Sequence, residues 1–348
     1  MRWDNLRLTD GSESDEERSG TAPLIERSVT RTFDTPGFRG MTFYEVQARS
    51  VINRVPKASH VPFRWTINPY RGCSHSCSYC FARNTHTYLD LDAGEDFNSQ
   101  VVVKVNAAEK VRHEIAAPKW RGEHIAMGTN VDCYQRAEGR YELMRGILAA
   151  LRDFRNPFSI LTKGSLILRD LDLLEQAADV TDVGTNVSVG FLDRDMWRTI
   201  ESGTPHPGKR LEVCHTLRQS GISCGVLMAP IVPYLTDSPA QLDATVRAIA
   251  EAGADSITPI VLHLRPGARE WFMSWLAEHH PGLVPRYEQL YGRGAYAPKA
   301  YTREISGQVR DLAQRYGVGK PRSGDTRRIP RQHASQPPAP RPEQLSLL

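Results

Sequence analysis

Short apolar runs alternate with longer amphipathic runs along most of the chain from residue 61 onward. Short runs of β-branched and apolar residues predict buried strands, whereas apolar residues that recur at helical spacing predict amphipathic helices. The predicted strands lie near residues 61–68, 101–105, 124–128, 158–162, 183–190, 222–231 and 256–262. The predicted helices cover residues 107–116, 140–154, 171–179, 209–220 and 239–253.

This alternation predicts an α/β fold built from repeated strand–helix units with a parallel sheet. Periodicity leaves two architectures open, a doubly wound sheet and a complete or partial barrel. In both, the loops that follow the strands gather on one face, where ligands bind. Functional residues are therefore expected just after the ends of strands.

The two ends of the chain lack this pattern. Residues 1–60 are expected to form an extended N-terminal arm with a short element around residues 41–52. Residues 319–348 are rich in Pro, Arg and Ser, a composition that cannot bury a core and predicts a disordered basic tail. The strand–helix domain then spans residues 61–318.

Composition adds limits on location and partners. The 348 residues are 40% hydrophobic and 24% charged, and no apolar run approaches the roughly 18 residues of a membrane helix. The first residues lack the apolar core of a signal peptide, so we expect a cytoplasmic protein with reduced thiols. The net charge of +4 is too small to indicate a nucleic-acid partner, although residues 320–341 hold six Lys or Arg and one acid, Asp325.

Three of the six cysteines lie within eight positions. Cys73, Cys77 and Cys80 follow a predicted strand with the spacing C-x3-C-x2-C, separated by small and polar residues. Three thiolates can hold an iron–sulfur cluster whose fourth iron stays open to another ligand. A Cys3His zinc site that includes His86 is the alternative. Arg71 would either stabilise an anionic cluster or lie at the surface.

This signature, with Tyr79 just before the last cysteine, resembles the radical S-adenosylmethionine (SAM) superfamily. Segments between about residues 40 and 300, among them FRWTINPYRGCSHSCSYCFAR and ILTKGSLILRDLDLL, are similar to the spore-photoproduct-lyase-like or "DNA repair photolyase" group, in an actinobacterial branch. The resemblance implies a partial (β/α)6-type barrel, a [4Fe–4S] cluster and SAM. It also implies reductive cleavage of SAM to a 5′-deoxyadenosyl radical, a protein reductant such as flavodoxin or ferredoxin, and a nucleic-acid lesion as substrate.

The loop after the second barrel strand is implied to hold the SAM amino group. Gly128, Thr129, Asn130 and Asp132 match that location, where backbone and side-chain donors reach a ligand. Asp132 is the candidate partner of the SAM ammonium, and a turn-capping role is the alternative.

Other SAM contacts are implied after further strands. Lys163 would meet the SAM carboxylate, or else be a solvated loop lysine. Ser188 would meet the ribose, or else be a satisfied core serine. Tyr79, beside Cys80, is a further expected contact of the cofactor. Glu201 and Arg210 flank a Gly/Pro-rich loop that resembles a lid, and the sequence assigns them no role.

The other cysteines differ in their expected roles. Spore photoproduct lyase uses a cysteine as a hydrogen-atom donor, and Cys133 is the candidate for that catalytic role, with a buried inert thiol as the alternative. Cys214 and Cys224 are predicted to lie in the core.

The last five residues, QLSLL at 344–348, resemble the peptide with which bacterial repair and replication proteins dock on the sliding clamp. A chance match is the alternative, because low-complexity tails often end in leucines. Two classes of function thus stay open: a radical SAM enzyme, and a zinc- or cluster-containing protein that binds nucleic acid or a clamp without SAM chemistry.

Overall fold

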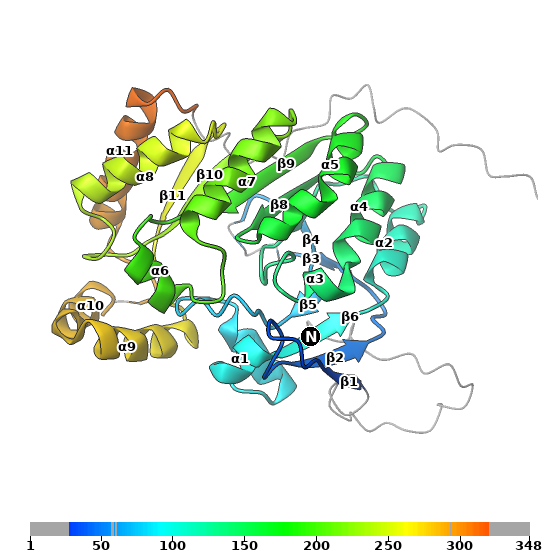
Figure 1. The fold of residues 1–348 in the computed structure, drawn as a ribbon, viewed down its shortest axis with the longest axis horizontal. Coiled ribbons are helices and arrows are strands. Elements are labelled where there is room, and N and C mark those ends of the chain that lie inside the picture. Colours follow the sequence, from blue (N-terminus) through cyan, green and yellow to red (C-terminus); the bar gives the residue numbers. More distant parts are fainter. Residues whose placement is uncertain (1–27, 57–58, 60, 293, 320–348) are drawn as a thin grey trace, which may run out of the picture.

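The computed structural model describes residues 28–56, 59, 61–292 and 294–319 (Figure 1). Within these residues the strands form two sheets, of which the larger has seven strands. Its strands are β3 (Ile52–Arg54), β4 (Trp65–Ile67), β7 (Ile125–Met127), β8 (Phe158–Thr162), β9 (Val183–Ser188), β10 (Ser223–Ile231) and β11 (Ile257–Val261).

The larger sheet is an open barrel wall. From β4 to β11 its strands are parallel and lie in chain order, and β3 pairs with β4 antiparallel at the edge. A doubly wound sheet would reverse its strand order at a switch point. No such reversal occurs within the described residues, so the partial barrel is confirmed.

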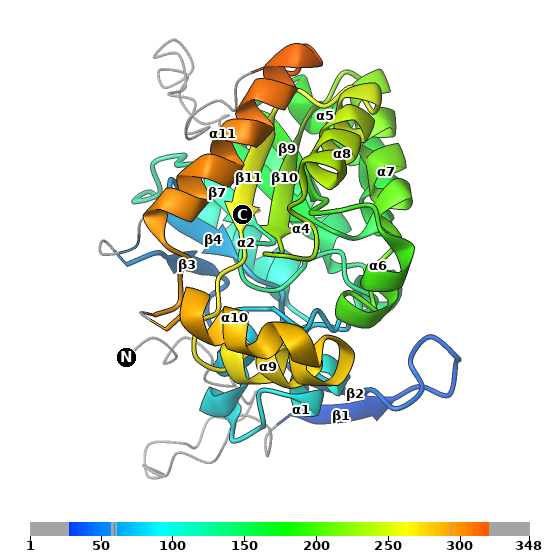
Figure 2. The ribbon, with the colours of Figure 1, turned by 90° about the vertical axis from the view of Figure 1, so that its left-hand side faces the viewer.

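Helices cover the outer side of this wall (Figures 1 and 2). The five predicted helices are observed as α2 (Ala107–Ala116), α4 (Leu143–Asp153), α5 (Leu171–Ala178), α7 (Pro207–Gln219) and α8 (Pro239–Glu251). The structure adds α1 (Glu95–Ser99), α3 (Glu138–Tyr141), α6 (Arg194–Ile200), α9 (Ala268–His279), α10 (Val284–Leu290) and α11 (Lys299–Arg315), and 3-10 helices at Arg83–Leu89, Ser165–Asp170 and Pro281–Leu283.

Local chemistry sets two of the helix starts. Glu142 has a left-handed φ of 50°, which separates α3 from α4 where the sequence predicts one helix over residues 140–154. Ser238 and Gln241 form a reciprocal capping box, so α8 begins at Pro239.

The smaller sheet carries the cysteine loop. It consists of β1 (Val29–Thr32), β2 (Thr42–Val46), β6 (Gln100–Lys104) and β5 (Tyr70–Arg71), in the order β1-β2-β6-β5. The strand predicted at residues 101–105 is β6, and it lies in this sheet instead of the barrel wall. After β4 the chain therefore leaves the barrel wall, adds β5 to the smaller sheet, and enters the cysteine loop.

Part of the expected arm belongs to the fold. Residues 28–56 supply β1 and β2 to the smaller sheet and β3 to the barrel wall. Residues 1–27 and 320–348 lie outside the described residues, as does the clamp-like peptide at 344–348. The boundaries at residues 60 and 319 and the clamp contact stay predictions. Within the described ranges, no helix is long and apolar enough to cross a membrane.

Replacing Phe43 with Ala tests whether the arm contributes to stability. Phe43 is fully buried, and its ring centroid lies 5.4 Å from that of Phe33 and 5.7 Å from those of Phe38 and Tyr141. Because the truncation leaves a cavity, Phe43→Ala should lower the free energy of unfolding by about 3–5 kcal/mol in urea denaturation. Val29→Ala, at a position that is 52% exposed, is the control and should cost less than about 0.5 kcal/mol. Equal effects of the two changes would contradict this contribution.

Candidate functional site

The cysteine loop begins where β5 ends and is held by backbone hydrogen bonds. Cys73 N donates to Phe97 O at 2.9 Å, and Cys80 N donates to Cys77 O at 3.2 Å. Gly72 precedes the loop with a φ of 82°, and a Cβ atom there would lie 2.5 Å from the carbonyl oxygen of Gln100. Only glycine fits at this point, because the chain turns sharply against β6.

The three thiols of this loop are free and shielded from solvent. Cys73 and Cys77 are buried, and Cys80 is half-buried. Burial raises the pKa of Cys73 well above its ordinary range, and the charges of Asp132, Cys80 and Cys77 raise it further. Burial also raises the pKa of Cys77, to about 12. The positive charge of Lys163 acts in the opposite direction and only partly offsets this effect. Thiols in such a setting ionise when they coordinate a metal, so the donor set suits a metal centre.

The described side chains do not gather around a single zinc ion. Among the described residues, no three His, Cys, Asp or Glu side chains form a group that could hold one metal ion. His86, the expected fourth zinc ligand, uses Nε2 in a 2.8 Å hydrogen bond with Gln100 O and packs edge-on against Phe97. A cubane binds each thiolate through a different iron, so its ligands need not converge on one point. Three free thiols on one loop have the donor chemistry of a [4Fe–4S] cluster, and their role as its ligands stays a prediction.

Gln135, which the sequence analysis missed, anchors the cysteine loop. Its buried amide accepts a hydrogen bond from Ser74 N at 2.9 Å and donates one to Gly72 O at 2.8 Å. The backbone N of Arg136 also donates to Ser74 Oγ at 3.1 Å. The loop after β7 thus holds the cysteine loop in place, and the signal was an amide side chain in a strand-exit loop.

Arg83 is the second missed residue. It is fully buried, and Nε and Nη2 donate to Cys77 O at 3.2 and 3.0 Å. Its guanidinium carbon lies 5.2 Å from the Phe97 ring centroid and 4.7 Å from that of Trp271. A positive charge therefore lies beside the cysteine loop. Arg71, for which a surface position was the alternative, is buried as well, and burial lowers its pKa to about 10.

The carboxylate of Asp132 joins three loops. Oδ1 accepts hydrogen bonds from Tyr134 N at 2.8 Å and Thr162 Oγ1 at 2.7 Å, and Oδ2 accepts one from Lys163 N at 2.6 Å. His75 Nδ1, from the cysteine loop, lies 3.4 Å from Oδ2. Burial alone would raise the pKa of Asp132, but His75 and these donors lower it to about 2. The bond to Tyr134 N is the turn-capping role, and the contact with the SAM ammonium stays a prediction.

Gly128 directly follows β7 and packs against the backbone of β8. Its φ is 75°, and a Cβ atom there would lie 1.8 Å from the carbonyl oxygen of Leu161, so only glycine fits. Thr129 and Asn130 follow it and are half-buried. These three residues lie on the loop that leads to Asp132, and their contact with SAM stays a prediction.

A buried chain of polar groups runs from the cysteine loop to α7. The Lys163 ammonium lies 5.6 Å from the centre of the Tyr79 ring, and the Tyr79 hydroxyl donates to Glu201. Glu201 pairs with Arg210, whose Nη1 donates to Ser188 O at 2.7 Å. Burial would raise the pKa of Glu201, but the charges of Arg210 and Lys163 bring it below its ordinary value. The predicted SAM contacts Tyr79, Lys163 and Ser188 are thus linked through two residues that the sequence left without a role.

Cys133 is fully buried. Burial raises its pKa well above the ordinary range, and the charges of Asp132 and Glu138 raise it further. The thiol is therefore protonated, which is the form that a hydrogen-atom donor needs, but it is enclosed by the core. Its catalytic role stays a prediction. Cys214 and Cys224 are buried in the core, as predicted.

Sequence comparison finds a matching family model and related proteins. The family model described as the radical SAM superfamily matches residues 67–259, more than half of the chain. An uncharacterised protein of Mycobacterium tuberculosis is 47% identical over 332 residues, which cover 95% of this chain and 96% of that protein. An uncharacterised protein of Methanocaldococcus jannaschii is 31% identical over 195 residues, which cover 56% of this chain and 69% of that protein.

Solved structures share the fold. Spore photoproduct lyase complexed with dinucleoside spore photoproduct matches with a TM-score of 0.60 at 15% identity, covering 80% of each chain. The resemblance stated from the cysteine signature is therefore confirmed for the superfamily and for the fold.

Replacing Glu201 with Gln tests the buried ion pair. The side chains of Glu201 and Arg210 are each 1% exposed, and the change leaves the guanidinium without its counter-charge. Glu201→Gln should lower the free energy of unfolding at pH 7 by about 3 kcal/mol, measured by urea denaturation. Glu212→Gln removes a solvent-exposed pair with Lys209 and should cost less than about 0.5 kcal/mol.

The same pair predicts a pH dependence with a definite sign. Because the folded state holds the pKa of Glu201 below its ordinary value of 4.5, its contribution is fully present above about pH 4.5 and is lost as the pH falls further. The difference in unfolding free energy between wild type and Glu201→Gln should therefore shrink on acidification below that point. A difference that grew toward low pH would contradict the ionised pair.

Proposed function

Because the chain belongs to the radical SAM superfamily, we propose that it is an enzyme that binds its cluster through Cys73, Cys77 and Cys80 and acts on a nucleic-acid lesion. Membership implies a [4Fe–4S] cluster, SAM and a reductant such as flavodoxin or ferredoxin. When bound, these groups supply one-electron cleavage of SAM and a 5′-deoxyadenosyl radical for hydrogen abstraction. The observation that supports the ligand assignment is the loop after β5, which holds three free thiols, two of them buried and one half-buried.

The surrounding residues have the charges that SAM needs. Lys163 lies at the exit of β8, where its ammonium would pair with the SAM carboxylate. Asp132 is ionised at every physiological pH and would face the SAM ammonium. Tyr79 and Ser188 complete the proposed cofactor contacts, and the Glu201–Arg210 pair holds both in position.

An exposed aromatic and arginine cluster supports a nucleic-acid substrate. Phe81, directly after Cys80, is 47% exposed, and Tyr296 is 54% exposed. The Arg265 guanidinium lies 5.5 Å from the Phe81 ring centroid, and its Nη2 donates to the Tyr296 hydroxyl at 3.0 Å. His263 packs edge-on against Tyr296 at 4.6 Å. Exposed aromatic rings beside arginine are the groups on which proteins stack unpaired bases.

Fold likeness is a second reason for proposing this substrate class. The spore photoproduct lyase of similar fold is complexed with a dinucleoside photoproduct. This is an analogy of fold, and the cluster of Phe81, Arg265 and Tyr296 is what supports it in this chain. The competing function, a metal-containing protein that binds nucleic acid or a clamp, predicts binding without SAM turnover.

Replacing Cys77 with Ala tests the ligand assignment. Anaerobically reconstituted wild type should hold about four irons and four sulfides per chain and form 5′-deoxyadenosine with SAM and reductant. Cys77→Ala should lose this product and most of the iron while keeping its circular dichroism spectrum. Cys214→Ala, which removes a core thiol on α7, should keep both. Product formation by Cys77→Ala, or one zinc and no sulfide in wild type, would reject the proposal.

Replacing the exposed rings tests the substrate class. We expect Phe81→Ala and Tyr296→Ala each to weaken the binding of a single-stranded oligonucleotide by about 1–3 kcal/mol in fluorescence anisotropy, since each loses a stacking surface. Phe154, the residue directly after α4, is 42% exposed, and the Arg112 guanidinium lies 5.8 Å from its ring centroid. Phe154→Ala is therefore the matched control and should bind as wild type does. Equal binding by all four proteins would rule out this surface.

A further inference from the structure

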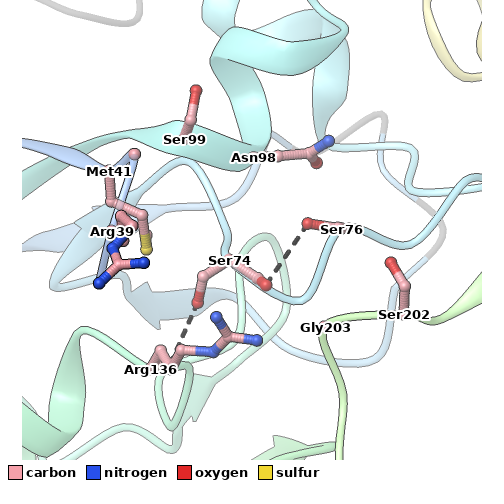
Figure 3. Close-up of a pocket in the computed structure, with 10 residues that line it drawn as sticks. Arg39, Met41, Ser74, Ser76, Asn98, Ser99, Arg136, Ser202 and Gly203 are labelled. Carbon is pink, nitrogen blue, oxygen red and sulfur yellow. Dashed lines mark hydrogen bonds between the residues drawn. The ribbon is translucent and has the colours of Figure 1, made fainter. Parts of the chain in front are cut away.

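A polar cavity of about 240 Å³ borders the cysteine loop (Figure 3). We call it the serine–arginine pocket. In the figure, Arg136 lies beside Ser74, and Arg39 lies near Met41. The described residues that line it are Arg39, Gly40, Met41, Ser74, Ser76, Asn98, Ser99, Arg136, Ser202 and Gly203.

The pocket has the chemistry of an anion site. Arg39 and Arg136 are exposed, and none of the described lining residues is acidic. Four serines and one asparagine supply further hydrogen-bond donors. Arginine forks bind carboxylates in pairs of parallel hydrogen bonds, so the pocket suits acidic side chains on a partner.

The pocket lies directly against the cluster ligands. Ser74 and Ser76 line it and are the immediate neighbours of Cys73 and Cys77. Gly203 closes it on the other side, where a Cβ atom would lie 2.1 Å from Ser74 O. A partner seated on this pocket would therefore contact the backbone that carries two of the thiols.

The pocket shares the cysteine loop with the aromatic and arginine cluster, because Ser74 and Ser76 line the pocket and Phe81 follows Cys80. The other segments of the two surfaces differ. That cluster joins the residue after Cys80 to the loop after β11, whereas the pocket joins the β1–β2 loop, the end of α1 and the loop after α6. In Figure 2 the β1–β2 loop, which carries Arg39, extends away from α10 and α11. The two surfaces thus have no lining residue in common.

We propose that the serine–arginine pocket is the docking surface for an acidic electron-transfer protein such as a flavodoxin or ferredoxin. This inference rests on the proposed cluster ligands. The docked donor would pass one electron to a cluster held by Cys73, Cys77 and Cys80, and no bond would form or break in that transfer. Electron-transfer complexes are small and transient, so two arginines and a few hydroxyls form a sufficient contact, with charge complementarity steering the encounter.

Reversing the charge of both pocket arginines tests this assignment, when the reconstituted holoenzyme is assayed with a protein reductant and with a small-molecule reductant. At low salt, Arg39→Glu/Arg136→Glu should slow flavodoxin-driven formation of 5′-deoxyadenosine by about tenfold and raise the dissociation constant for flavodoxin at least about fivefold. With photoreduced 5-deazariboflavin, an uncharged small donor, the rate should stay within about twofold of wild type. The flavodoxin defect should shrink as salt screens the charges.

Two control proteins separate charge from folding. Arg247→Glu changes the net charge at an exposed position of α8, outside the pocket, and should behave as wild type. Arg39→Lys/Arg136→Lys keeps the positive charges and should recover most of the flavodoxin-driven rate.

Three outcomes would overturn the docking surface. They are an equal slowing with both reductants, an unchanged dissociation constant for flavodoxin, and a loss of oligonucleotide binding with unchanged flavodoxin kinetics. The last would assign the pocket to a nucleic-acid backbone. Absence of 5′-deoxyadenosine in wild type with either reductant would instead reject the proposed function, while the dissociation constants still judge the docking surface.

Discussion

The carboxylate of Asp132 is the contact on which the arrangement of the site depends. It accepts hydrogen bonds from its own loop and from the loop after β8, and it faces His75 in the cysteine loop. A buried carboxylate must find several donors, because its desolvation is costly. Three segments distant in sequence therefore meet at Asp132: the cysteine loop, the loop after β7 and the end of β8 with the residue that follows it.

Two further devices keep the cysteine loop in this position. Gln135 hydrogen-bonds to the backbone on both sides of Cys73, and Arg83 hydrogen-bonds to the carbonyl of Cys77. The smaller sheet also anchors the start of the loop, because β5, which leads into it, pairs with β6. The N-terminal segment that supplies β2 to this sheet is thus part of the framework of the site, and Arg39 from the same segment reaches the outer side of the loop.

The buried pair of Glu201 and Arg210 connects the loop to the helical layer. A buried ion pair has a high desolvation cost and is a weak source of stability by itself. The pair positions its neighbours instead, because Glu201 accepts a hydrogen bond from the Tyr79 hydroxyl and Arg210 donates one to the Ser188 carbonyl. The proposed electron donor and substrate then approach the same loop from different surfaces, one next to Ser74 and the other next to Phe81.

The sequence by itself determined the strand and helix order, the partial barrel and the cysteine signature. The strand and helix order follows from local periodicity, whereas the partial barrel was implied by the family resemblance of the short cysteine motif, and neither needs knowledge of distant contacts. Tertiary structure alone decided that β6 joins the smaller sheet, that residues 28–56 belong to the fold, and that Gln135, Arg83, Glu201 and Arg210 surround the thiols. Each of these depends on partners far away in the chain, and a single polar residue in a loop carries no periodic signal that would reveal its partner.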